Sequence, residues 1–316
     1  LKSHFIIHLQ NNHNNLSMAN LVTILGSDRF LPVFDTLTAH LPIKDIVALT
    51  RTCRTLKPLY QNLVSRGAWN INDRLKQFVN DPVGFRKRLT ELDGIISGGF
   101  ALQFMDRVRW EGSDLDVCVQ VGEKADAFCR YMEEVEGYDL ASRKVGKYNW
   151  THVDMVHQYD KVVDGEIVRL EIILTHQHPI HSTLSTYTTA LVNVITGNHA
   201  YSIFPNATFI KRQTYPTRIP DYFNGVILHQ KYKDRGWQFI QRIPKKKRVT
   251  EELDLGRRHI GDKHTWKIAL SPMSDKAADS AEGAVEGLEF EMKRCQDLSY
   301  EVALEWLDVV ATQQTG

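Results

Sequence analysis

Two aspartates, Asp114 and Asp116, stand two residues apart in the run Ser-Asp-Leu-Asp-Val. Side chains alternate between the two faces of an extended strand, so these two carboxylates point the same way. Leu115, Val117 and Val119 then point to the opposite face, toward a core. Two carboxylates on one face repel each other unless a cation lies between them, and Mg²⁺ prefers oxygen ligands of this kind together with phosphate. The spacing therefore predicts that Asp114 and Asp116 bind a metal ion.

A glycine pair, Gly98 and Gly99, ends the apolar run that precedes these aspartates. Glycine lets backbone N–H groups come close to an anion, and the Ser113 hydroxyl could donate a hydrogen bond to a phosphate. The alternative is a tight turn that leads into an edge strand whose aspartates face water. The order and spacing of the glycine pair and the acidic strand together favour a nucleotidyltransferase-like fold.

A third carboxylate, Glu171, interrupts the otherwise apolar segment 167–174. A buried, unpaired carboxylate is costly, so Glu171 needs a partner or a cation. The alternatives are a pair with Arg169 or exposure to solvent. Asp164-Gly165 predicts a hairpin that joins strands over 152–159 and 166–175.

The composition excludes several classes of protein. The chain has 316 residues, 42% of them hydrophobic, which is enough for one large or two modest cores. Its formal net charge is only +1, so its overall charge does not attract it to nucleic acid or to a membrane. Four scattered cysteines without a CxxC pair argue against a disulfide framework and a zinc ribbon. No apolar run approaches the length of a membrane span. We expect no membrane association and a cytoplasmic or nuclear location.

The fold class expected is α+β, with a helical N-terminal module, a mixed-sheet domain with flanking helices, and a helical acidic tail. The predicted parts are a disordered segment over 1–27, the helical module over 28–66, a helical linker over 67–93, the sheet domain over 94–270, and an acidic linker with an amphipathic helix over 271–316. In the module, Ile46, Leu49, Cys53 and Leu56 recur at helical spacing. This module packs on a partner or, alternatively, forms a cap on the next domain.

Apolar periodicity predicts the elements of the sheet domain and the tail. We expect strands over 94–98 and 115–121, and helices over 100–107, 123–136 and 183–195. The inner face of the 123–136 helix consists of Ala125, Phe128, Met132 and Val135. In the tail, Val285, Leu288, Met292 and Cys295 repeat at the spacing of an amphipathic helix.

Two further clusters have weaker signals. His176, His178 and His181 could bind zinc or nickel, but a polar loop is favoured. Residues 231–248 carry eight basic residues and one acidic residue with aromatics between them, which would suit a nucleic-acid backbone, although the aromatics fit a core as well. The run that begins at Pro244 resembles a short nuclear localisation signal.

Several motifs resemble a group of fungal proteins that join an F-box-like segment to a nucleotidyltransferase-fold domain. The motifs are Gly98-Gly-Phe-Ala-Leu, Ser113-Asp-Leu-Asp-Val, Ala190-Leu-Val-Asn-Val-Ile-Thr-Gly, Ala200-Tyr-Ser-Ile-Phe-Pro and Lys233-Asp-Arg-Gly-Trp. The resemblance covers about Phe30 to Trp266. It implies that the helical module docks on a Skp1-like adaptor of ubiquitin ligases, with the partner-binding residues Leu41, Pro42, Ile46 and Leu49.

The same resemblance implies roles at the acidic site. Gly98 and Gly99 would hold a triphosphate with help from the Ser113 hydroxyl, and Asp114 and Asp116 would bind Mg²⁺. Glu171 would be the third carboxylate, which helps to activate an acceptor hydroxyl, with Asp154 on the other hairpin arm as its rival. The negative charge that develops on the phosphates during the reaction would be neutralised by one of four basic residues, Lys211, Arg212, Lys231 or Lys233. The first function expected is an interaction protein with a nucleotide-binding domain. The alternative is an active, Mg²⁺-dependent nucleotidyltransferase acting on a hydroxyl.

Overall fold

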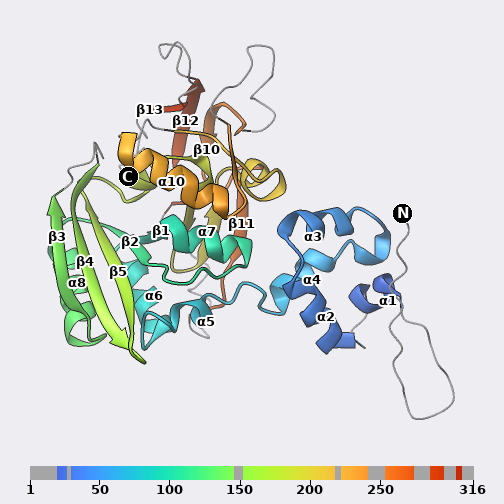
Figure 1. Cartoon of the computed structure of the whole chain (residues 1–316), viewed down its shortest axis with the longest axis horizontal. Coiled ribbons are helices and arrows are strands. Elements are labelled where there is room, and N and C mark those ends of the chain that lie inside the picture. The colour runs from blue at the N-terminus through green and yellow to red at the C-terminus, as the bar shows by residue number, and fades with distance from the viewer. Residues whose placement is uncertain are drawn as a thin grey trace, which may run out of the picture. The chain divides into compact units, whose positions relative to one another are not determined.

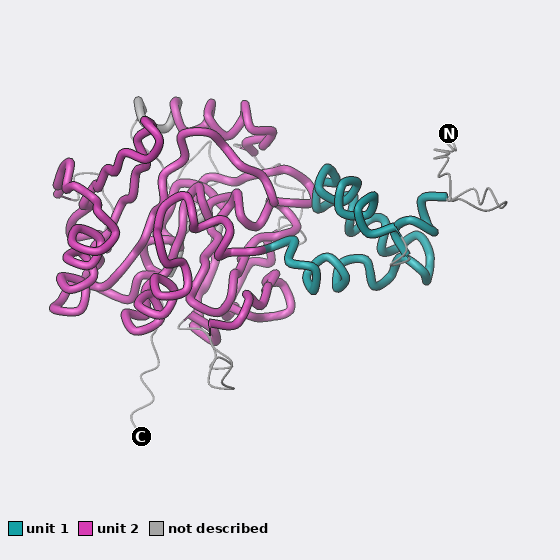
Figure 2. Tube along the Cα trace, turned by 90° about the horizontal axis from the view of Figure 1, so that it is seen from below, with its two compact units in different colours: residues 1–69 teal, residues 70–316 magenta. Residues whose placement is uncertain are grey.

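The structure, a computed structural model, describes residues 20–26, 30–145, 152–217, 222–240, 253–273, 285–294 and 304–307. The chain divides into two compact units, residues 1–69 and 70–316 (Figure 2). The helices expected to form a linker over 67–93 therefore belong, from residue 70 onward, to the second unit. Across the described ranges, no helix combines the length and apolar character needed to cross a bilayer.

Short helices form the first unit: α1 (Leu21–Gly26), α2 (Leu31–Ala39), α3 (Ile43–Thr50), η2 (Arg54–Leu56) and α4 (Leu59–Ser65). Their buried side chains include Phe34, Ile46, Leu56 and Leu63. The helical module predicted over 28–66 is thus a set of helices that bury apolar residues.

The predicted apolar face of this module is only partly correct. Helix α3 ends at Thr50, so Cys53 lies beyond it and is exposed. Among the predicted partner-binding residues, Ile46 is 1% exposed and is not available to a partner on the surface. Leu41, Pro42 and Leu49 are half-buried. The periodicity of the module identified a core position and did not separate it from a docking surface.

The second unit is a mixed α+β fold (Figure 1). Within the described ranges, eight strands form the main sheet in the order β11-β7-β6-β1-β2-β5-β4-β3. Their bounds are β1 Ile95–Ser97, β2 Leu115–Gln120, β3 Asp139–Val145, β4 Val153–Val163, β5 Glu166–Thr175, β6 Asn193–Ile195, β7 His199–Ser202 and β11 Trp266–Ala269. A further sheet has the order β10-β12-β13 (Gly256–His259, Glu289–Arg294, Leu304–Leu307), and β8 (Gln213–Thr214) pairs with β9 (Gln238–Phe239).

Helices connect and cover these strands. Their bounds are α5 Ile71–Leu75, α6 Pro82–Glu91, α7 Gly98–Asp106, α8 Glu123–Glu134, α9 Ile180–Leu184, η3 Thr189–Leu191, η4 Asn206–Ile210 and α10 Tyr222–Asp234. Helix α8 packs on one face of β4, since Tyr159 Oη donates to Glu133 Oε1 at 3.1 Å. The opposite face of the β2–β5–β4 region stays free of α8 and carries the acidic residues.

The predicted strands and helices around the acidic run are confirmed. Strands β1 and β2 are antiparallel, whereas β2 and β5 are parallel. The hairpin between β4 and β5 turns at Asp164 and Gly165, whose φ angles of 51° and 86° are the two positive values that a tight type I′ turn requires. Val135 is an exception on α8: the helix ends at Glu134, so Val135 is 62% exposed.

Two predicted helices are wrong. Residues 183–195 form the end of α9, η3 and then strand β6, because the β-branched residues of that run favour a buried strand over a helix. In the tail, the predicted helix is replaced by β12. Phe290 and Met292 are buried two residues apart, which is the spacing of a strand, and the match to helical spacing was coincidental.

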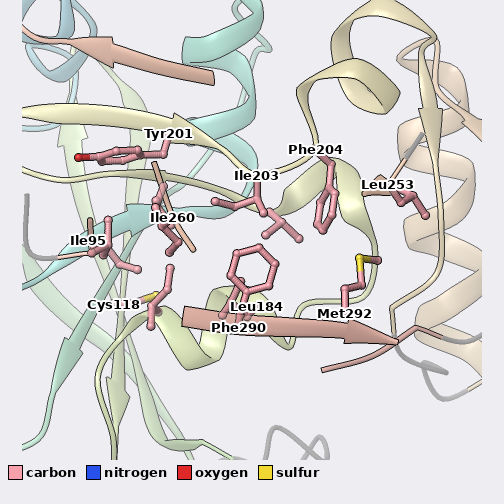
Figure 3. Packing of buried hydrophobic residues seen from close by; sticks show 14 of the residues in the cluster. Ile95, Cys118, Leu184, Tyr201, Ile203, Phe204, Leu253, Ile260, Phe290 and Met292 are labelled. Atoms are coloured by element: carbon pink, nitrogen blue, oxygen red, sulfur yellow. The ribbon is translucent and has the colours of Figure 1, made fainter. Parts of the chain in front are cut away.

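A core of buried residues joins the main sheet to the C-terminal strands. Ile95 and Cys118 from the sheet, Leu184 from α9, and Phe290 and Met292 from β12 belong to this one cluster (Figure 3). Strand β12 is therefore part of the core of the second unit. This core also reaches the face of the sheet that carries the acidic residues, because Cys118 lies two residues after Asp116 on β2 and projects from the same face.

Candidate functional site

Three side chains lie in register across the centre of the main sheet. Ser97 on β1 is the cross-strand partner of Asp116 on β2, and Asp116 is the partner of Glu171 on β5. Residues paired in this way project from the same face of a sheet. Asp114 precedes β2 by one residue and shares that face. Among the described residues, Asp114, Asp116 and Glu171 each offer an oxygen, and these oxygens lie within 4.8 Å of one another. The predicted convergence of the three carboxylates is confirmed.

The alternatives for Glu171 do not form. Arg169 forms an ion pair with Asp160, with Nε 2.8 Å from Oδ1. The rival carboxylate Asp154 is directed elsewhere, with Oδ1 3.5 Å from Nε2 of His176. Glu171 therefore completes the cluster, and Asp154 does not.

Burial and repulsion from neighbouring carboxylates raise the pKa of two members of the cluster, Asp116 and Glu171. The pKa of Asp116 is raised well above its usual value by burial, and further by the negative charges of Asp114 and Glu171; the Gly99 N–H and Lys231 oppose this rise. Burial also raises the pKa of Glu171, and Asp114 adds to it. Three close carboxylate oxygens with too little positive charge around them fit a hard divalent cation such as Mg²⁺.

We expect Asp116→Asn to raise the thermal stability of the metal-free protein at neutral pH. Because the pKa of Asp116 is higher in the folded protein than in the unfolded chain, Asp116 costs no stability at pH values below the ordinary pKa of Asp. It destabilises the fold increasingly as the pH rises through its pKa in the folded protein. The amide has no charge to bury, so the variant should melt a few degrees higher, at roughly 2–4 °C per kcal/mol. Melting curves in EDTA at acid and neutral pH measure this. Identical pH dependence in both proteins would contradict it.

Gly98 is required at its position for two reasons. Its φ of 62° is unfavourable for residues with a side chain, and a Cβ there would overlap Asp116 Oδ2. Gly99 has open space, with Tyr232 Oη 3.8 Å from a Cβ built there. The glycine pair thus lets the first turn of α7 approach Asp116, and the backbone N–H of Gly99 acts to lower the pKa of that carboxyl.

The carboxylates line a pocket of about 200 Å³. The predicted nucleotide-binding residues Gly98, Gly99 and Ser113 all line it as well. Of the four predicted cations, Lys231 lines the pocket, and Arg212 instead pairs with Asp106 at 2.7 Å. Lys211 and Lys233 are not among the lining residues.

Arg235 also lines this pocket, and the sequence analysis missed it. Its guanidinium carbon lies 3.9 Å from the centre of the Trp110 ring, and burial lowers its pKa. The available signal was spacing: Lys231 and Arg235 are four residues apart, which is one turn of a helix. Nothing in the sequence, however, indicated that the helical turn with Lys231 and Arg235 lies beside the carboxylates.

An aromatic cluster holds the end of α10 against the segment that follows α7. The rings of Trp110, Tyr232 and Trp237 lie 6.1–6.3 Å apart, and Trp237 Nε1 donates to the Thr208 carbonyl at 3.0 Å. Tyr232 and Trp237 are buried, which confirms the core interpretation of these aromatics. Residues 241–248, with the remainder of the basic run and the nuclear localisation motif, lie outside the described residues.

The histidine cluster forms no metal site within the part of the chain that the structure describes. His178 Nδ1 accepts a hydrogen bond from the Ile180 N–H at 3.2 Å, and His181 is buried with its ring 5.1 Å from that of His152. The polar-loop interpretation applies to His176, whose side chain is more than half exposed beside Asp154.

No family profile and no curated protein matches this chain. Solved structures that match include a CCA-adding enzyme with CTP, at 14% identity and a TM-score of 0.37, covering 58% of this chain and 44% of that one. The Thermotoga maritima CCA-adding enzyme complexed with tRNA matches at 16% identity with the same TM-score and coverage. The chain spans less than half the length of these structures, and similarity at this level leaves function to be judged from the site itself.

Proposed function

We propose that the second unit binds a nucleoside triphosphate together with Mg²⁺ and transfers a nucleotidyl group to a hydroxyl acceptor. The observation that carries this proposal is the meeting of Asp114, Asp116 and Glu171, with oxygens within 4.8 Å of one another, in a pocket that also contains Lys231 and Arg235. Clustered carboxylates suit a metal, and neighbouring cations suit phosphate. A single pocket with both is suited to a metal–polyphosphate ligand.

The chain offers several groups to the phosphates. Helix α7 begins at Gly98 in the pocket, and the first N–H groups of a helix bind anions. Ser113 adds a hydroxyl, and Lys231 and Arg235 add positive charge. The stacking of Arg235 on Trp110 restrains its orientation, which lowers the entropy lost when it contacts a ligand.

In this proposal Asp114 and Asp116 hold the metal, with Glu171 beside them. When bound, Mg²⁺ supplies charge neutralisation at the phosphate oxygens. The acceptor oxygen forms a bond to the α-phosphorus, the bond to pyrophosphate breaks, and the hydroxyl proton passes to a Glu171 carboxylate oxygen. A carboxylate with a raised pKa is a better proton acceptor at neutral pH than an ordinary one.

Glu171→Gln should keep nucleotide binding and lose turnover by at least about 100-fold, because the amide cannot accept the proton. The measurement is incubation of the full chain with each labelled nucleoside triphosphate and Mg²⁺, followed by detection of labelled protein or pyrophosphate release. Binding is measured separately by calorimetry. A Glu171→Gln protein with wild-type turnover would remove Glu171 from this role.

The Skp1-like adaptor role rests on the sequence resemblance alone and stays a prediction. Of its four contact residues, Ile46 is buried, so a docking surface on the first unit would use Leu41, Pro42 and Leu49. Co-purification of the full chain with a Skp1-like protein tests this role independently of the acidic site. The cytoplasmic or nuclear location also stays a prediction.

A further inference from the structure

The pocket continues past the carboxylates in the strand direction. Strands β2 and β5 are parallel, and on each the next residue on the same face also lines the pocket: Cys118 follows Asp116, and Ile173 follows Glu171. Two residues along a strand span roughly 7 Å. One end of the pocket is therefore acidic, and the next level toward the carboxyl ends of the strands is apolar.

Helix α9 forms the wall at this apolar level. Ser182 lies close enough to the Cys118 thiol to oppose the rise that burial causes in its pKa, which places α9 beside β2 one level beyond Asp116. Ser182 and Thr183 both line the pocket. The hydroxyl of Ser182 is already satisfied, since Oγ donates to the Pro179 carbonyl at 2.8 Å.

The hydroxyl of Thr183 has no such partner. Thr183 is 3% exposed, and among the described residues nothing hydrogen-bonds its Oγ1. A buried hydroxyl that gives up water without gaining a partner is unfavourable. Its position in the pocket wall means that a bound ligand can supply the missing partner.

The pocket lining also includes apolar side chains, beside the polar side chains of Thr186 and Tyr187. Ile173, Leu191 and Leu228 line the pocket together with Thr183. Apolar surfaces with one unsatisfied hydroxyl suit a flat, weakly polar ring that has hydrogen-bonding groups on its edge. The phosphate-binding groups, by contrast, lie at the level of the carboxylates.

We propose that the α9 end of the pocket binds the base of the nucleoside triphosphate, with the Thr183 hydroxyl hydrogen-bonded to the edge of the base. This inference rests on the proposed function and adds a location for the base. The hydroxyl both donates and accepts, so it can serve a base edge of either polarity. Thr183 is a specificity-determining residue in this arrangement and takes no part in the proton transfer.

The test is Thr183→Val in the full chain, which removes the hydroxyl and nearly preserves the shape. Thr208→Val is the matched control: Thr208 is 0% exposed, its Oγ1 also has no partner among the described residues, and it does not line the pocket. The ligands are the four nucleoside triphosphates and inorganic tripolyphosphate, each with Mg²⁺, measured by calorimetry. Tripolyphosphate has the same three linked phosphates, with one more ionisable oxygen, and has no base.

Thr183→Val should weaken binding of the preferred nucleoside triphosphate about fivefold to tenfold and leave tripolyphosphate binding unchanged. Thr208→Val should change neither. Equal nucleotide affinity in wild type and Thr183→Val, or an equal loss for tripolyphosphate, would overturn the location of the base while leaving the proposed function in place. If wild type bound neither ligand, the proposed function would fail first and this inference with it.

Discussion

Asp116→Ala should abolish Mg²⁺-dependent transfer from a nucleoside triphosphate, with a loss of about 1,000-fold or more. Asp116 is the central member of the row, paired with Ser97 on one side and Glu171 on the other. Loss of its carboxylate leaves only two acidic side chains to hold a metal, Asp114 just before β2 and Glu171 on β5. A metal that holds a reacting phosphate contributes several kcal/mol to the transition state, and each 1.36 kcal/mol is tenfold in rate.

Asp154→Asn is the matched control for this experiment. Asp154 lies on the neighbouring strand β4, belongs to the same sheet and is directed at His176 instead of the pocket. Its activity should equal that of wild type. Labelled-nucleotide transfer by Asp116→Ala at the wild-type rate would show that the chemistry does not occur at this cluster.

Gly98→Ala should damage the site as strongly while leaving every carboxylate in the sequence. The added methyl overlaps Asp116 Oδ2, and a φ of 62° is unfavourable for alanine. Either α7 or the Asp116 side chain must shift. We expect a loss of unfolding free energy of about 2 kcal/mol or more, and a loss of Mg²⁺-induced stabilisation.

Gly99→Ala provides the comparison for stability and for metal binding. A Cβ at Gly99 meets only Tyr232 Oη at an ordinary contact distance of 3.8 Å, and alanine favours the helix by about 0.5–1 kcal/mol over glycine. The melting temperature should be equal to or above that of wild type, and the stabilisation by Mg²⁺ should persist. Equal destabilisation of both variants would mean that the close approach of Asp116 to α7 is not what requires glycine.

The individual carboxylates Asp114, Asp116 and Glu171 could be predicted from the sequence because each has a local signal. Alternation on one strand gave Asp114 and Asp116, and an isolated charge within an apolar strand pointed to Glu171. The turn at Asp164-Gly165 is a short-range signal of the same kind. Each of these inferences needs only a few neighbouring residues.

Other features depend on distant contacts and could not be predicted in this way. Arg235 reaches the pocket because Trp110 packs against both Tyr232 and Trp237, which lie more than a hundred residues further along the chain. Strand β12 formed where helical spacing was present, since pairing with β10 and burial of Phe290 determined its conformation. Periodicity also could not tell the buried Ile46 from an exposed docking residue.

The parallel pairing of β2 (Leu115–Gln120) with β5 (Glu166–Thr175) has a consequence for how the protein folds. Because the ligating oxygens come from both strands, the chain must close a long crossover through α8, β3 and β4 before the third carboxylate arrives. Contacts so far apart in sequence form late and slowly. A chain in which β5 has not yet paired with β2 has two aspartates that repel each other and no complete ion site. Mg²⁺ would therefore stabilise only the molecules in which this pairing has formed.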